Sequence, residues 1–296
     1  MGPGHPECPQ RLDAIADHLR STGLDIGLDF RDAPEATRAQ LERAHTAGYV
    51  AELTALLAEV RDGGRPRALD PDTVASPATL HAALRAAGAA VAATDDVLAG
   101  RATNAFCAVR PPGHHATRDE TMGFCFFNNV AVAARHALDG HGLARVALID
   151  FDVHHGNGTE DIIAGDERVL MCSFFQHPLY PYSGAVPKGT NMVNVPIAPY
   201  ARGAEVRQAI EDMWLPRLEE FRPQMLFVSA GFDAHREDDL GQLGLVEADY
   251  EWITRRLVEV AERHAQGRIV SCLEGGYNLS ALARSVASHL RVLADL

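Results

Sequence analysis

Short apolar segments alternate with amphipathic helical segments from about residue 104 onward, and this alternation constrains the fold more than any other feature. The apolar segments are rich in strand-forming residues and lie at 105–109, 146–149, 169–174, 193–195, 225–229 and 268–273. Helical periodicity predicts helices between and after them, at 129–139, from about 159, 205–221, 250–264 and 280–293. This alternation is typical of an α/β fold with a mostly parallel sheet covered by helices on both faces.

The part of the chain before residue 104 is predicted to be mainly helical, at 10–21, 47–59 and 76–98. Gly63, Gly64 and Pro66 break this pattern. No internal repeat or low-complexity linker is present. The length of 296 residues allows one large α/β domain or two smaller ones.

The composition excludes several classes of function. The formal net charge of −13 argues against a nucleic-acid-binding protein, because that class is basic. The same charge suits a cationic substrate or partner, although many acidic chains carry such charge for solubility alone. No apolar run of about 18 residues occurs, so no membrane span is expected. The five cysteines form no Cys-x-x-Cys pair and the start has no apolar signal region, which predicts a cytoplasmic protein.

Chemically reactive residues are concentrated directly after the predicted strands. The first strand is followed by Arg110-Pro-Pro-Gly-His114-His115, and the second by Asp150-Phe-Asp152-Val-His154-His155-Gly-Asn157-Gly. The last two strands end in Ala-Gly-Phe-Asp233 and Glu274-Gly-Gly-Tyr277. Because ligands of such sheets bind beyond the carboxyl ends of the strands, we expect these motifs to form one site.

Asp152, His154 and Asp233 are the candidate metal ligands. In an extended segment, residues two apart point to the same side, so Asp152 and His154 can share one cation. Asp233 follows a very apolar strand, where a carboxylate without a partner would be unfavourable. The alternative is that Asp233 caps a helix. Two carboxylates and one imidazole suit zinc and also Fe(II).

The adjacent histidines His114 and His115 can act as a proton-transfer pair, with Asp150 and Asn157 in the next loop as partners that tune the imidazoles. A solvated loop is the alternative for two adjacent histidines. The phenol of Tyr277 follows two glycines and can donate a hydrogen bond to a developing oxyanion. A surface tyrosine would have the same local sequence.

These motifs, in this order and spacing, resemble the histone deacetylase superfamily of zinc-dependent amidohydrolases. The segments 123–129, Gly-Phe-Cys-Phe-Phe-Asn-Asn, and 5–11, His-Pro-Glu-Cys-Pro-Gln-Arg, match as well. Asn157 and the Gly-Phe pair before Asp233 are similar to the class II branch and its bacterial relatives. The resemblance covers essentially the whole chain. It implies the arginase/deacetylase fold: a single domain over 1–296, with a central, mostly parallel sheet of about eight strands and helices on both faces.

Two metal sites are implied by the resemblance. The catalytic zinc would be bound by Asp152, His154 and Asp233. A structural potassium ion would lie near it, bound by Asp150, Ser173 and the carbonyls of Asp152, His154 and Phe174.

The catalytic groups implied by the resemblance are the two histidines and the tyrosine. His114 would pair with Asp150, and His115 with Asn157. His115 would be the general base and later the general acid. Class I members have an Asp where Asn157 stands, so the neutral amide should leave the pKa of His115 less elevated. Tyr277 would stabilise the tetrahedral oxyanion.

The resemblance also implies a tunnel for an acyl-lysine side chain. Phe124 and Tyr180 would form its walls, and the Gly123 carbonyl would accept the scissile N–H. Arg11 would line the inner cavity through which acetate leaves. The polyamine-selective branch has a Glu seven residues after the last zinc ligand, and here that position is Leu240. An acetyl-lysine peptide or protein is therefore favoured over an acetylated polyamine, which the acidic charge keeps as the alternative.

Two features depart from the family pattern. The chain begins close to the segment 5–11, where relatives usually carry a strand first, so a truncated or misassigned start is expected. The loop 176–189 also differs from the usual sequence of the tunnel mouth. The oligomeric state stays open, and a homo-oligomer is compatible with the sequence.

Two rival functions are tested by particular residues. An arginase-like ureohydrolase would need further carboxylates for a second metal, but Gly156 and His235 stand at the two positions. An inactive binder of acylated partners would be expected to have lost a ligand, a tandem histidine or the tyrosine. All of these residues are present.

Overall fold

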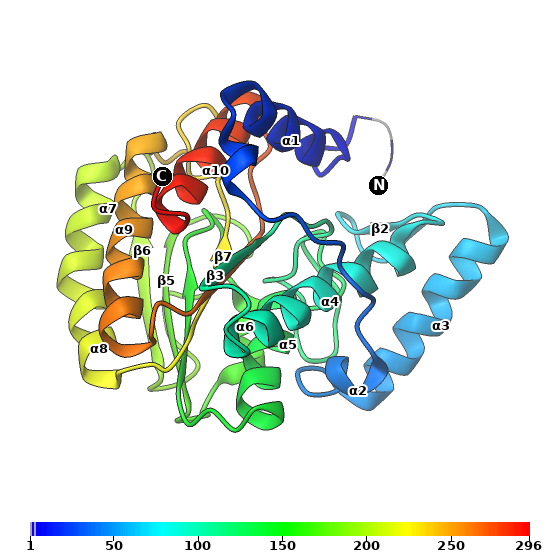
Figure 1. Cartoon of the computed structure of the whole chain (residues 1–296). Coiled ribbons are helices and arrows are strands. Elements are labelled where there is room, and N and C mark those ends of the chain that lie inside the picture. Colours follow the sequence, from blue (N-terminus) through cyan, green and yellow to red (C-terminus); the bar gives the residue numbers. More distant parts are fainter. Residues whose placement is uncertain (1, 3) are drawn as a thin grey trace.

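A six-stranded sheet, parallel throughout, forms the centre of the computed structural model, which describes residue 2 and residues 4–296 (Figure 1). The order of the strands is β3-β8-β7-β4-β5-β6. Their bounds are β3 (Asn104–Cys107), β4 (Val146–Asp150), β5 (Val169–Gln176), β6 (Met192–Ile197), β7 (Leu226–Ala230) and β8 (Ile269–Leu273). A separate antiparallel pair consists of β1 (Arg67–Ala68) and β2 (Val74–Ala75).

Helices cover both faces of the sheet (Figure 1). One layer contains α1, α8, α9 and α10, and the other contains α3, α4, α5 and α6. The α-helices are α1 (Gln10–Thr22), α2 (Arg38–Leu41), α3 (Ala47–Gly63), α4 (Thr79–Leu98), α5 (Asn129–Arg135), α6 (Asn157–Ile163), α7 (Gly203–Ala209), α8 (Leu215–Phe221), α9 (Glu247–His264) and α10 (Leu279–Leu293). A 3-10 helix η1 (Leu24–Gly27) and two π-helical turns, η2 (His136–Gly140) and η3 (Ile210–Trp214), complete the set.

The alternation of side chains along each strand divides the core into two halves. On β4, Ala147 and Ile149 pack against the layer of α1, α9 and α10, whereas Val146 and Leu148 pack against the layer of α3 to α6. Because successive side chains of a strand point to opposite faces, a strand buried on both sides must be apolar at every position. The observed α/β architecture with helices on both faces confirms the predicted fold class.

The sheet has six strands, not the eight or so that the family resemblance implied. The chain has six apolar segments of strand length between residues 104 and 273, and each one forms a strand of this sheet. Two predicted helices are also interrupted. The helix predicted over 129–139 changes to the π turn η2 at His136. The helix predicted over 205–221 contains the π turn η3 just before Pro216, because proline cannot donate to the carbonyl four residues earlier and its ring clashes there.

The strand register brings the reactive motifs together. Asp150, the last residue of β4, lies opposite Ser173 of β5 and Ser229 of β7. The loops that follow β3, β4, β7 and β8 therefore leave the same edge of the sheet side by side. None of the helices in the described part of the chain has the length and apolar content needed to cross a bilayer. The five cysteines form no disulfide with one another.

Candidate active site

The three predicted zinc ligands converge at the carboxyl edge of the sheet. His154 Nδ1 lies 3.0 Å from Asp152 Oδ1 and 3.2 Å from Asp233 Oδ2. Asp152 and Asp233 are buried, and backbone amides hold their second oxygens: Gly275 N–H donates to Asp152 Oδ2 at 2.8 Å, and Val153 N–H donates to Asp233 Oδ1 at 2.9 Å. One oxygen or nitrogen of each ligand residue can therefore face a common point.

This set of atoms fits a divalent cation. Asp233 Oδ2 has no hydrogen-bond partner among the described residues, because His154 Nδ1, 3.2 Å away, does not have the geometry of a hydrogen bond to it. A buried oxygen in this state is unfavourable unless a further ligand binds there. A Cβ at residue 275 would lie 2.0 Å from the same oxygen, so only glycine leaves the approach free. Burial raises the pKa of Asp233 to about 7, and the charge of Asp152 acts in the same direction. Burial lowers the pKa of His154, but Asp152 and Asp233 outweigh it and raise that pKa to about 10. A dication would relieve this excess of negative charge.

The tandem histidines lie next to the ligands, with ring centroids 4.1 Å apart. His114 Nδ1 is 2.9 Å from Asp150 Oδ2, and His115 Nδ1 is 2.7 Å from Asn157 Oδ1. Because an amide oxygen only accepts, His115 carries its proton on Nδ1 and keeps a free lone pair on Nε2. Both predicted pairings are thus present in the structure.

The two imidazoles have opposite pKa shifts. Burial lowers the pKa of His114, but Asp152 and Asp150 reverse this effect and raise it well above its usual value. Burial, together with the charges of His114 and His154, lowers the pKa of His115 well below its usual value. The hydrogen bond to Asn157 acts in the opposite direction and raises this pKa, but it is outweighed. His115 is therefore neutral at physiological pH, and its Nε2 is free to accept a proton.

Tyr277 lies on a turn that the side chains of Arg11 and Asp238 hold in place. Its pKa is raised well above the usual value by burial and by the charge of Asp233, so the phenol keeps its proton. Arg11 is fully buried, donates to the carbonyl of Gly276 at 2.7 Å, and stacks over the Tyr277 ring with its guanidinium carbon 5.0 Å from the centroid. Asp238 accepts from the N–H of Tyr277 at 2.6 Å.

The two predicted tunnel walls, Phe124 and Tyr180, pack against different residues of this group. The Phe124 ring packs edge-on against Tyr277, with centroids 6.0 Å apart, and the Tyr180 ring packs edge-on against His115 at 5.2 Å. Gly123 has φ +55°, and a Cβ there would lie 2.3 Å from a ring carbon of His115. Leu240 is half-buried and is joined to the Tyr277 turn through Asp238 Oδ1, which accepts its N–H at 3.0 Å.

The residues predicted for potassium also lie together. Asp150 and Ser173 face each other across β4 and β5, and Phe174 is the next residue of β5. Asp152 and His154 follow β4 directly. The side chains of Asp150 and Ser173 are buried.

Sequence reasoning missed two buried carboxylates that connect the loops of the site. Glu274 accepts from the N–H groups of Gly113 and His114, at 2.6 and 3.1 Å, and from Ser229 Oγ at 3.0 Å. Asp238 accepts from three backbone N–H groups, two of them in the Tyr277 turn. An acid directly after an apolar strand is a weak signal for Glu274, and nothing local marks Asp238 among its acidic neighbours.

His155, which had no predicted role, anchors the loop that carries Tyr180. Its Nδ1 lies 2.9 Å from Ser183 Oγ, and its ring packs against Phe175 with centroids 4.7 Å apart. Burial lowers the pKa of His155 to about 3, so the ring is neutral. Asn194 donates to the carbonyl of Gly184 in the same loop at 2.9 Å.

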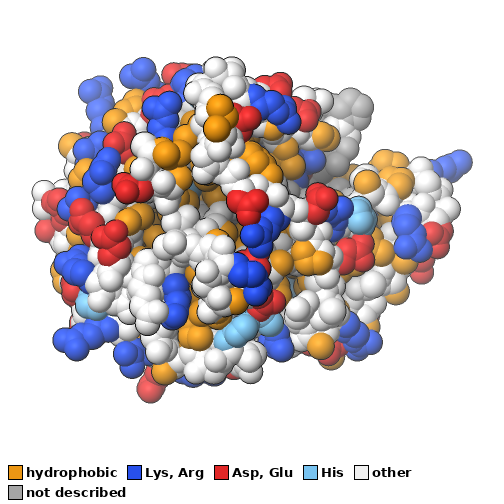
Figure 2. All heavy atoms as spheres, in the orientation of Figure 1, with side chains coloured by type: hydrophobic (Ala, Val, Ile, Leu, Met, Phe, Trp, Pro, Cys, Tyr) orange, Lys and Arg blue, Asp and Glu red, His pale blue; other side chains and the backbone are white. Residues whose placement is uncertain are grey.

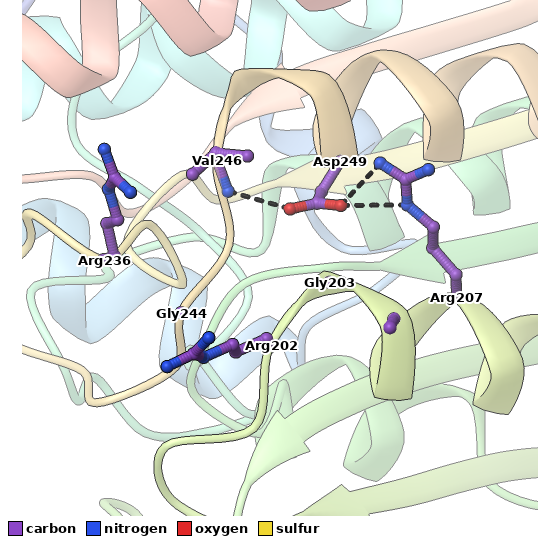
Figure 3. A pocket seen from close by; sticks show the side chains of 8 residues that line it. Arg202, Gly203, Arg207, Arg236, Gly244, Val246 and Asp249 are labelled. Carbon is purple, nitrogen blue, oxygen red and sulfur yellow. Dashed lines mark hydrogen bonds and ion pairs between the residues drawn. The ribbon is translucent and has the colours of Figure 1, made fainter.

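Two surface features lie outside this site. A cavity of about 650 Å³ is lined by Arg202, Arg207, Arg236 and Asp249, among others, and contains none of the predicted site residues (Figure 3). Arg207 and the N–H of Val246 both bind Asp249, which leaves this carboxylate well satisfied. On the face seen in Figure 2, acidic and basic side chains are mixed, so the net charge is not gathered into one acidic field there.

Comparisons with known proteins agree with this geometry. A family model described as the histone deacetylase domain matches residues 5–293. A histone deacetylase-like amidohydrolase of Pseudomonas aeruginosa is 41% identical over 93% of this chain and 73% of its own length. A probable deacetylase of Archaeoglobus fulgidus is 37% identical over 94% of this chain and 78% of its own length.

The structural comparison extends the agreement to the fold. The solved HD domain of HDA15 matches with a TM-score of 0.90 and 34% identity, over 98% of this chain and 82% of that chain. The match confirms the predicted arginase/deacetylase fold in a single domain. The chain belongs to the histone deacetylase family of hydrolytic deacetylases.

Proposed function

We propose that this deacetylase is zinc-dependent and hydrolyses the N-acetyl amide of lysine side chains to the free amine and acetate. The observation that carries the proposal is the convergence of Asp152, His154 and Asp233 beside a neutral, oriented His115. A buried carboxylate oxygen without a partner, at a point where glycine alone leaves room, supports the metal site.

Asp152, His154 and Asp233 would hold the zinc ion. When bound, such an ion supplies a Lewis acid for the amide carbonyl and lowers the pKa of water. Fe(II) would suit the same donor atoms and is the alternative metal. A structural potassium ion would be held beside it by Asp150, Ser173 and the carbonyls of Asp152, His154 and Phe174.

The chain's own groups supply proton transfer and stabilisation of charge. The free Nε2 of His115 would take the proton of the attacking water and then donate it to the leaving amine. The hydrogen bond from Nδ1 to Asn157 fixes the orientation that this transfer needs. His114, hydrogen-bonded to Asp150, would stabilise the negative charge of the transition state, and the phenol of Tyr277 would donate to the oxyanion.

We assign substrate selection to the rings of Phe124 and Tyr180 and to the loop after Asp233. Phe124 and Tyr180 would enclose the aliphatic part of the acyl-lysine side chain, and the Gly123 carbonyl would accept the amide N–H. Arg11 would line the cavity that receives acetate. Leu240 at the mouth favours a peptide or protein substrate, whereas an acetylated polyamine would be better served by an acid at this position.

The decisive experiment compares rates on acetyl-lysine peptides and on N-acetylated polyamines, with enzyme stripped of metal and reloaded with zinc, iron or manganese. We expect turnover with zinc and higher kcat/KM on the peptides. A preference for polyamines would reassign the substrate class. Absence of turnover on all substrates with every metal would favour a binding protein for acylated partners.

A further inference from the structure

Two histidines and one aspartate form a second cluster of potential metal ligands, apart from the active site. Asp95 lies in α4, His136 begins the π turn η2, and His141 follows that turn. The Nε2 atoms of His136 and His141 lie 2.7 and 2.6 Å from the same oxygen, Asp95 Oδ1. The three side chains thus present two nitrogens and one oxygen to a common point.

The π turn is what brings the two histidines together. In an α-helix, residues three or four apart share a face, whereas a π turn is closed by bonds between residues five apart. His136 and His141 are five apart, and their rings pack edge-on with centroids 5.0 Å apart. A continuous α-helix over 129–139, as the sequence predicts, would not align them in this way.

The cluster is open enough to receive an ion. The Asp95 and His141 side chains are 40% and 35% exposed, and the His136 side chain is 11% exposed. Water can therefore complete a coordination shell on the outer side. Both imidazoles are hydrogen-bonded to the same oxygen, Asp95 Oδ1, and these two bonds hold the rings together in the structure.

Arg43 stabilises an arrangement of His136 that competes with metal binding. Its guanidinium contacts Nδ1 of His136. Since arginine can only donate, Nδ1 must accept, and the proton of a neutral His136 then lies on Nε2 and points at Asp95. A metal on Nε2 requires the opposite tautomer, with the proton on Nδ1. Arg43 and a metal ion would therefore exclude each other.

We propose that Asp95, His136 and His141 form a second divalent metal site, which takes zinc through Asp95 Oδ1 and the two Nε2 atoms. Binding would displace the Nε2 protons to solvent or to Nδ1, and Arg43 would leave His136. Two imidazoles and one carboxylate with open positions suit zinc. The site would join α4 to the end of α5, and it does not depend on the proposed substrate of the active site.

The test counts zinc ions per chain and measures their affinity. Full-length protein is equilibrated with zinc, passed through metal-free buffer and analysed by plasma mass spectrometry, with isothermal titration for affinity. We expect two zinc ions in the wild type and one in His141→Ala and in Asp95→Asn. Loss of a direct ligand should weaken the second site at least about tenfold, since even a lost supporting hydrogen bond has an effect of that size.

Two controls separate this site from other causes. His81→Ala removes a histidine of the same helix that meets only one carboxylate, Glu35, at 2.5 Å, and should keep two zinc ions. Arg43→Gln should tighten the second site, because the competing donor is gone. Circular dichroism and deacetylase activity at one zinc per chain establish that each variant is folded.

A single zinc in the wild type that is retained in His141→Ala and in Asp95→Asn overturns the proposal. So does equal zinc content and affinity in the wild type, His141→Ala and Asp95→Asn, because the second ion would then lie elsewhere. In either case the cluster is a hydrogen-bonded contact between α4 and η2 and nothing more.

Discussion

Replacing Asp238 by asparagine tests whether a buried carboxylate outside the reaction positions the proposed oxyanion donor. Asp238 Oδ2 accepts from the N–H groups of Tyr277 and Asn278 at 2.6 and 3.0 Å, and its Oδ1 accepts from the N–H of Leu240 at 3.0 Å. An asparagine has one acceptor oxygen. If that oxygen stays with the Tyr277 turn, the NH₂ group of the asparagine side chain faces the N–H of Leu240. Two donors then meet, and the N–H of Leu240 has lost its acceptor.

The magnitude follows from these three bonds. One backbone N–H group that loses its acceptor costs about 1–3 kcal/mol. The other two bonds change from an ionised to a neutral acceptor, which roughly halves their strength. We expect the free energy of unfolding to fall by about 2–4 kcal/mol. The phenol of Tyr277 shifts with its backbone, and we expect kcat to fall by about 10- to 100-fold, less than when a donor is removed outright.

The assay measures kcat, KM, zinc content and the affinity for a hydroxamate inhibitor in Asp238→Asn, with Asp239→Asn as the matched control. Asp239 is the exposed neighbour of Asp238 and should be replaced without effect. Positioning predicts a loss in kcat with zinc content retained. A folded Asp238→Asn enzyme with kcat within twofold of the wild type would refute the reasoning. A parallel loss of zinc would instead indicate a collapsed site.

Four further predictions concern the active site. Tyr277→Phe should lower kcat about 10²- to 10³-fold with zinc retained, measured by initial rates and metal analysis. Asn157→Asp should raise the pKa of His115, so the acidic limb of the pH profile of kcat/KM should move to higher pH; an unmoved limb argues against His115 as the base. Burial raises the pKa of Glu274 to about 7 from 4.5, so its contribution to stability is present below pH 4.5 and lost as the pH rises through 7. The free energy of unfolding of the wild type, measured with denaturant, should therefore fall relative to that of Glu274→Gln between pH 4.5 and 7. The same pH dependence in both proteins would contradict this. Leu240→Glu should raise kcat/KM for acetylated polyamines relative to peptides, and an unchanged ratio would remove Leu240 from selection.

The local pattern of the chain was enough to predict the layers and the edge of the sheet where the site forms. Each apolar segment became a strand, and the motifs after β3, β4, β7 and β8 met at the carboxyl edge. The spacing of Asp152 and His154 placed both on one side of an extended segment. These features depend on residues close in sequence, so periodicity and spacing are sufficient to find them.

Contacts between distant loops were beyond the reach of the sequence. Glu274 binds the N–H of Gly113, 161 residues away, and Asp238 binds the N–H of Tyr277, 39 residues away. The π turn that aligns His136 with His141 was likewise predicted as ordinary helix. Each of these features depends on which elements are neighbours in space.

The sequence by itself determined the α/β class, the candidate metal ligands and the tandem histidines, because each of these is encoded in short-range patterns. Only the tertiary structure decided which loop supports which candidate catalytic group. The physical reason is that β4, β7 and β8 are buried at every position. Their sequences therefore have the same continuous apolar pattern, which does not indicate the order of the strands. Burial alone is satisfied by many strand orders, and the order β3-β8-β7-β4-β5-β6 is fixed by the packing of the whole chain.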